Sequence, residues 1–322
     1  MVVVDGDEEV VLAEAAAAAA QRVDRACGAM LGLAIGDALG ATVEFMTPRE
    51  ISAQYGVHDR IRGGGWLRLP AGDVTDDTTM TFALAEAWLG AGGPPDARAC
   101  ADAFDAWMRA KPVDIGNTVR RGIVRWRLHG TAQAEPSSDA GNGATMRCLP
   151  AALATVGADT AAIEQAALVQ ARVTHHNPLT DAATLCAVRM VHAAFAGAGM
   201  PGVLAEADHL VAAHGEFAFR DRRCDNPSGF IVDTMRAVCQ ALAERNGFQA
   251  VLTDVVNRGG DADTTGAIAG MIVGAVVGET GLPAAWRQAV KPAVRKECVR
   301  LACGLLELAP VSRGAVAGAA LR

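Results

Sequence analysis

Aromatic residues are scarce in this 322-residue chain: they make up 4% of it and include a single tyrosine. Hydrophobic residues nevertheless account for 51%, so the apolar content is mostly Ala, Val and Leu. This composition favours closely packed helices over sheets, and no stretch shows a convincing alternation of apolar and polar residues. We therefore expect an all-α protein.

Strong basic character and long apolar runs are also missing. The formal net charge is −7, and no long run of Lys or Arg occurs. This charge argues against a nucleic acid or an anionic membrane bound through bulk charge, although it leaves a local basic patch open. The longest apolar run, 266–278, is shorter than the roughly 20 residues that cross a bilayer. We interpret it as a buried central helix.

The eight cysteines form no CxxC pair, and the start of the chain, MVVVDGDEEVV, lacks the basic region and apolar core of a signal peptide. Both features predict a cytoplasmic protein whose thiols are reduced.

Helical periodicity recurs along the chain, and the six alanines of 15–20 also favour a helix. Segments rich in Gly, Pro and other turn-forming residues cut the chain into about a dozen helices. These breakers lie at 90–95, 130–143, 196–202, 223–229 and 258–261. No fixed-period repeat and no linker occurs, so we expect one compact domain spanning 1–322.

Oxygen-bearing side chains gather in AGDVTDDTTMTF (71–82), directly ahead of an apolar run. A single Asp or Thr at a helix start is ordinarily a cap. Asp76 and Asp77, however, stand side by side and repel each other unless a cation or several hydrogen-bond donors neutralise them. The pair therefore favours a metal site over capping alone.

A second oxygen cluster occurs in NRGGDADTTGAIAG (257–270), between a glycine-rich turn and a helix expected to start near Thr265. Residues two apart in a turn, such as Asp261 and Asp263, can direct their carboxylates at one point. Glu44, after the apolar segment 28–43, is either a further acid of this site or a solvated charge at a helix end.

The ligands available in these motifs are carboxylates and hydroxyls, without Cys or His. Hard oxygen ligands select Mg²⁺ or Mn²⁺, with Ca²⁺ as an alternative, over zinc. Four or five carboxylates are enough for two ions about 3.5 to 4 Å apart.

Five motifs, in order along the chain, resemble the ADP-ribosylglycohydrolase family. They are GAMLGLAIGDALGATVEF, VTDDTTM, DAGNGATMR, THHNPLTDAA and NRGGDADTTGAIAG. The resemblance implies an all-α fold with a cleft that holds two Mn²⁺ or Mg²⁺ ions, with Glu44 beside them. By motif match, the implied metal ligands are Thr75, Asp76, Asp77, Asp261, Asp263 and Thr264.

KPVDIGNTV (111–119) is, from its residues alone, equally well a turn in which Asn117 caps a helix. The resemblance implies instead that Asp114 is a candidate general acid or base near the scissile ribose, with Gly116 and Asn117 at the substrate. Either Asp114 or Glu44 would handle the proton of the guanidine leaving group, and the resemblance does not decide between them.

The remaining substrate residues follow from the same resemblance. The glycine-rich loop DAGNGATMR can offer backbone amides to a phosphate, and the family places pyrophosphate and ribose there. His175, ahead of a helix start at Pro178, is implied to line the ADP-ribose pocket. The residues implied to contact substrate here are Gly141, Asn142, Gly143, Met146, Arg147, His175 and Phe230.

Two positions depart from the family pattern. Phe230 stands where relatives commonly carry an aromatic residue, often tyrosine, that stacks on the ligand, so a hydroxyl is lost and the stacking face is kept. Thr79 stands where close relatives often have an acid, which concerns the fine tuning of the metal rim and not the metal itself.

Within the family, GGGWLRLPAGDVTDD and AWMRAKPVDIGNTVRRGI are similar to members that remove ADP-ribose from an arginine of dinitrogenase reductase, the nitrogenase iron protein. We therefore expect metal-dependent hydrolysis of that N-glycosidic bond. The resemblance also implies two regulatory partners, a PII signalling protein and an ammonium channel that draws the protein reversibly to the membrane.

Three alternatives remain. The first is hydrolysis of another linkage, such as ADP-ribosyl-serine or a small ADP-ribose ester. The second is an ADP-ribose-binding protein that has lost catalysis, against which the complete set of metal-motif oxygens argues. The third is an all-α terpenoid synthase, which fits poorly because such enzymes need an aromatic-lined cavity for carbocations.

Overall fold

The chain is described by a computed structural model that covers residues 6–313, with side chains from residue 13 onward. The side chains of the starting segment MVVVDGDEEVV lie outside this range. Within it the regular elements are helices, with two isolated β-bridges, which confirms the predicted all-α class. The helices are α1 Gly6–Gly40, α2 Pro48–Tyr55, α3 Asp76–Ala91, α4 Ala97–Arg109, α5 Asn117–His129, α6 Leu149–Ala154, α7 Thr160–Ala171, α8 Pro178–Phe195, α9 Gly199–Ala213, the 3₁₀ helix η1 Gly215–Phe217, α10 Ile231–Glu244, α11 Phe248–Val256, α12 Ala262–Val277, α13 Ala284–Ala289 and α14 Pro292–Leu308.

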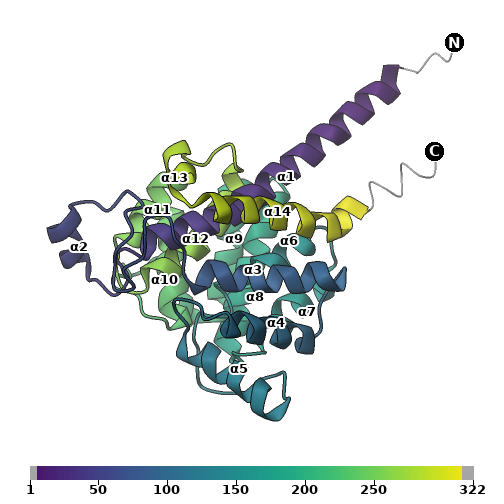
Figure 1. The fold of residues 1–322 in the computed structure, drawn as a ribbon. Coiled ribbons are helices and arrows are strands. Elements are labelled where there is room, and N and C mark those ends of the chain that lie inside the picture. Colours follow the sequence, from purple (N-terminus) through teal and green to yellow (C-terminus); the bar gives the residue numbers. More distant parts are fainter. Residues whose placement is uncertain (1–5, 314–322) are drawn as a thin grey trace.

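Two antiparallel helices, α1 and α12, run through the centre of the fold (Figure 1). Glycines recur every fourth residue on the facing side of each helix, so that the two backbones touch. A Cβ atom at Gly36 would lie 2.0 Å from the carbonyl oxygen of Gly266, and one at Gly40 would lie 2.2 Å from that of Ala262. Contact of this kind fixes the end of α1 against the start of α12.

The 266–278 run is largely buried within α12 and the turn that follows it, as predicted. The helix begins at Ala262 and not near Thr265, because the carbonyl of Asp261 already accepts a helical hydrogen bond from the amide of Thr265, at 3.1 Å. Asp263 and Thr264 therefore lie in the first turn.

Other helices pack around this central pair: α14 lies on α1, and α8, α10 and α11 lie on α12. Towards the amino terminus α1 projects from the body, and the predicted helix of 15–20 lies in this exposed part (Figure 1). Among the described helices, none combines the length and apolar character that crossing a membrane requires.

Candidate metal and substrate site

Most of the candidate residues meet at one cavity of about 330 Å³. Its walls come from the segment after α1, the start of α3, the loop before α5, the glycine-rich loop at 141–143 and the start of α12. The antiparallel packing of α1 and α12 brings the segment after α1 beside the start of α12. The lining includes Glu44, Asp76, Asp114, Gly116, Asn117, Gly141, Asn142, Gly143, Met146, His175, Asp261, Asp263 and Thr264.

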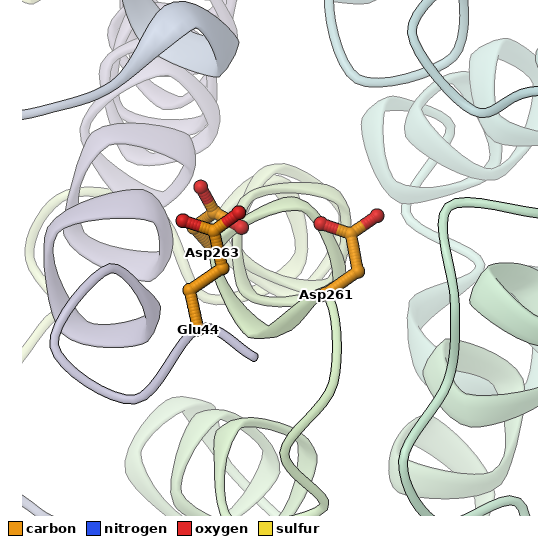
Figure 2. Close-up of side chains that lie close together, drawn as sticks. All are labelled: Glu44, Asp261 and Asp263. Atoms are coloured by element: carbon orange, nitrogen blue, oxygen red, sulfur yellow. The ribbon is translucent and has the colours of Figure 1, made fainter. Parts of the chain in front are cut away.

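Three carboxylates form the centre of the site. Figure 2 shows Glu44 reaching from the segment after α1 towards Asp263, with Asp261 beside them at the start of α12. One oxygen from each of the three lies within 4.8 Å of the others. Glu44 is 5% exposed, so the interpretation as a solvated helix-end charge is wrong. This acidic triad could hold a metal ion.

Asp77 joins the two oxygen clusters. Its Oδ2 accepts hydrogen bonds from the hydroxyls of Thr75, at 3.2 Å, and Thr264, at 3.3 Å. Its Oδ1 is enclosed and has no hydrogen-bond partner among the described residues. An unpaired buried carboxylate oxygen is costly, and a bound cation would satisfy it. The oxygens present therefore fit a hard divalent cation.

Asp37 is a further buried acid, which the sequence analysis did not single out. Its carboxylate accepts hydrogen bonds from the amides of Thr75 (2.9 and 3.0 Å) and Thr78 (3.1 Å), and from the Thr78 hydroxyl (2.5 Å). The side chain of Thr75 makes no capping bond, so Asp37 of α1 caps α3 in its place. A lone Asp inside the apolar segment LAIGDALG was the signal for it.

Burial raises the pKa of the acids in this cluster. Desolvation is the main cause, and neighbouring carboxylates add to it. The pKa of Glu44 rises to about 8 and that of Asp76 to about 7. The pKa values of Asp77 and Asp263 are raised well above their ordinary values by the same two causes. Without a cation, the cluster therefore retains protons near neutral pH.

The loop between α4 and α5 forms another wall of the cavity. Asp114 is half-buried there, and its Oδ1 accepts a hydrogen bond from the amide of Ile115 at 2.7 Å. Asn117 is the first residue of α5 and Gly116 occupies the capping position, without a side-chain capping bond. The interpretation of Asn117 as a helix cap is therefore wrong, and its side chain remains available to the cavity.

The glycine-rich loop packs directly on His175. A Cβ atom at Gly141 would lie 3.0 Å from the His175 Nε2, and one at Gly143 would lie 3.0 Å from its Cε1. The side-chain amide of Asn142 donates to the Oδ2 of Asp261 at 2.6 Å. This bond connects the glycine-rich loop to the acidic triad, so the two parts of the site support each other.

Arg147 does not line the cavity, which corrects its expected place at the substrate. It is fully buried, and its guanidinium donates to the side chain and carbonyl of Gln170 and, at 2.7 Å, to the hydroxyl of Thr174. The Thr174 hydroxyl in turn lies 2.7 Å from the Nδ1 of His175. Burial, followed by the charges of Arg147 and Arg121, lowers the pKa of His175 to about 3. Arg147 therefore influences the cavity indirectly, because it helps to keep the imidazole of His175 neutral.

Neither of the two departures from the family pattern lines the cavity. Phe230 is 43% exposed and bridges to Gly141 through its backbone, and Gly229, not Phe230, lines the cavity. The hydroxyl of Thr79 accepts a hydrogen bond from the Trp107 indole at 3.0 Å and so ties α3 to α4.

A larger cleft, of about 1050 Å³, lies between α2 and α11. It contains none of the residues singled out from the sequence, so the smaller cavity is the candidate functional site.

The chain is similar over most of its length to known proteins. The chain is 50% identical to "ADP-ribosyl-[dinitrogen reductase] glycohydrolase" of Rhodospirillum rubrum over 89% of this chain and 97% of that protein. It is 34% identical to "ADP-ribosylarginine hydrolase Tri1" of Pseudomonas putida (strain GB-1), over 90% of this chain and 80% of that protein.

A solved structure, "ADP-ribosylglycohydrolase-related protein complex", is 32% identical and superposes with a TM-score of 0.79, covering 89% of this chain and 99% of that one. The ADP-ribosylglycohydrolase family model matches residues 18–315. The resemblance of the five motifs is thereby confirmed: the chain belongs to the ADP-ribosylglycohydrolase family.

Proposed function

We propose that this protein hydrolyses the N-glycosidic bond between ADP-ribose and an arginine of dinitrogenase reductase, using two Mn²⁺ or Mg²⁺ ions. The observation that carries the proposal is the convergence of the two Asp/Thr motifs on a cavity beside the glycine-rich loop. The 50% identity to a protein named for this reaction supports the substrate.

The metal ligands would come from two helix starts, with Glu44 beside them. Bound ions would orient and acidify a water and stabilise developing negative charge. The buried Oδ1 of Asp77, which has no other partner among the described residues, supports its place as a ligand. The proposed ligands are Thr75, Asp76, Asp77, Asp261, Asp263 and Thr264.

The guanidine must either depart neutral or be protonated on the way out, and the second route needs an acid within reach. Asp114 lines the cavity but does not belong to the acidic triad. It is therefore the better candidate for this proton, while Glu44 remains with the triad. Gly116, Asn117 and the glycine-rich loop would hold the ADP-ribose, with the neutral His175 beneath.

Partners beyond the substrate rest on the family resemblance alone. A PII signalling protein and, through it, a membrane ammonium channel are the partners that we propose. Residues 1–322 are proposed to act as one domain.

The test of this function is release of ADP-ribose from arginine-modified dinitrogenase reductase with Mn²⁺ and after chelation, beside a serine-linked substrate. We expect metal-dependent release from arginine alone. Release from serine alone would show that the protein acts on ADP-ribosyl-serine and not on modified dinitrogenase reductase. No release from either substrate would favour an ADP-ribose-binding protein that lacks catalysis.

Variants separate metal binding from proton transfer. Asp77→Ala and Asp261→Ala are expected to lose Mn²⁺ binding and turnover together, because each removes a charged oxygen of the cluster. Asp114→Ala is expected to bind Mn²⁺ as before and to lose turnover by about 10² to 10⁴-fold. A full rate in the Asp114 variant would remove this residue from the mechanism.

A further inference from the structure

Trp66 contacts the acidic triad from outside the family motifs that define the ligands. Its indole Nε1 donates a hydrogen bond to the Oε2 of Glu44 at 2.6 Å. Among the described side chains, this is the hydrogen bond that the Glu44 carboxylate accepts. Trp66 is 51% exposed and Glu44 only 5%, so the indole lies on the solvent side of the carboxylate.

The backbone around Trp66 is built for this placement. Gly63, Gly64 and Gly65 all have positive φ, and Gly64 pairs with Leu69 through two hydrogen bonds of 2.7 and 2.9 Å. A Cβ atom at Gly65 would lie 2.2 Å from the carbonyl oxygen of Ala41. The glycines thus let the Trp66 turn lie against the segment that carries Glu44.

The Glu44 segment is held on its other side as well. Phe45 adopts a φ of 64°, which is costly for a residue with a Cβ atom, and its amide donates to the Gly260 carbonyl at 2.7 Å. The amide of Gly260 donates back to the carbonyl of Met46 at 2.9 Å. The ring of Phe45 lies 5.5 Å from that of Trp66, between centroids. Both the backbone and the aromatic pair therefore restrain this segment.

Glu44 needs such a restraint because two other acids lie beside it. Its carboxylate lies within 4.8 Å of oxygens of Asp261 and Asp263, and repulsion between the three acids, once they are ionised, favours rotamers that turn Glu44 away towards solvent. A neutral N–H donor attached to one oxygen opposes that rotation without adding a charge that would compete with a cation.

We propose that Trp66 is a positioning residue that holds the Glu44 carboxylate beside the other two acids of the acidic triad, Asp261 and Asp263. The kinetic test of this role rests on the proposed hydrolysis. The orientation of the Glu44 carboxylate can also be tested without turnover, through Mn²⁺ affinity. Trp66 does not line the cavity and acts through Glu44.

The test compares Trp66→Phe, which keeps the ring and removes the donor, with Glu44→Gln and the double variant. We expect Trp66→Phe to lower kcat about tenfold with KM changed less than about twofold. The double variant should be no slower than Glu44→Gln, since the indole then has no carboxylate to orient. The same non-additive pattern is expected for Mn²⁺ affinity, measured by titration of the free ion by electron paramagnetic resonance.

Trp126 offers a matched control. Its Nε1 donates to a carboxylate oxygen of Asp102 at 3.1 Å, between α5 and α4 and away from the cavity. Trp126→Phe should leave both kcat and Mn²⁺ affinity unchanged. The proposal would be overturned if the double variant lost kcat by the product of the two single losses. It would also be overturned if Trp66→Phe had the same kcat and Mn²⁺ affinity as Trp126→Phe. If the wild-type protein hydrolyses neither substrate, the Mn²⁺ affinities of the same variants still test whether Trp66 positions Glu44.

Discussion

Asp37 stabilises the start of α3 from a different helix, directly beside the proposed metal ligands. The amides of Thr75 and Thr78 both donate to it, so the position of Asp76 and Asp77 depends on a residue of α1. Burial raises the pKa of Asp37 to about 6, although its hydrogen bonds lower it again in part. A single side chain thereby links the capping of one helix to the geometry of the proposed cation site.

Asp37→Ala should lower the free energy of unfolding by about 1–3 kcal/mol, because buried donors lose their acceptor. It should also weaken Mn²⁺ binding, since the first turn of α3 loses its support. Urea denaturation and Mn²⁺ titration measure the two effects.

Asp96→Ala is the control for Asp37→Ala. Asp96 caps the exposed start of α4 by accepting a 2.7 Å hydrogen bond from the Ala99 amide. This control should cost about 1 kcal/mol and leave Mn²⁺ binding intact. Equal Mn²⁺ affinity in both variants would contradict the role of Asp37.

At the scale of elements, the contact between α1 and α12 decides whether the site exists. Glycine at every fourth position brings the two backbones together, and this contact places Glu44 beside Asp263. Larger residues would separate the helices and move the two halves of the acidic triad apart. The glycine pattern is thus a requirement of the site as well as of the core.

Gly36→Ala should destabilise the protein by about 1–3 kcal/mol or more, because the new methyl group would lie 2.0 Å from a backbone oxygen of α12. Gly90→Ala, in an exposed part of α3 with no atom near the added Cβ, should instead be neutral or stabilise by about 0.5–1 kcal/mol. Denaturant midpoints measure both. A Gly36 variant as stable as the wild type would show that α1 and α12 can move apart without cost.

At the scale of the whole molecule, the buried acids make stability depend on pH and on metal. A carboxyl whose folded pKa is raised binds more protons in the folded than in the unfolded state, so its contribution falls as pH rises through the folded value. Glu44, with a pKa of about 8, and Asp76, at about 7, titrate in the neutral range. Metal-free protein should therefore lose stability between pH 7 and pH 8.

Thermal melting at these two pH values, with and without Mn²⁺, tests this expectation. We expect the Tm of metal-free protein to fall by about 2 °C over this interval, and Mn²⁺ to raise Tm more at pH 8 than at pH 7, because fewer protons compete for the ligands. Glu44→Gln should flatten the metal-free slope. A metal-free Tm that rises with pH would show that the cluster is ionised before pH 7.

The sequence predicted the helical class and the oxygen clusters, and both concern local properties. Asp261 and Asp263 lie two residues apart, so their convergence follows from a turn alone. The prediction that Arg147 contacts the substrate was wrong, because a motif match carries no information on burial. Its guanidinium instead donates hydrogen bonds to Gln170 and Thr174. The roles of the cavity residues remain predictions for the variants above.

By itself, the sequence determined the family, the all-α class and the hard-oxygen chemistry of the ligands, since helix preference and ligand type belong to individual side chains and short segments. Only the tertiary structure decided which oxygens meet. The Thr264 hydroxyl donates to Asp77 across 187 positions of sequence, and Trp66 donates to Glu44 across 22. Such pairs depend on how the helices and turns that carry the two residues pack against each other, and no local pattern encodes a partner at that separation.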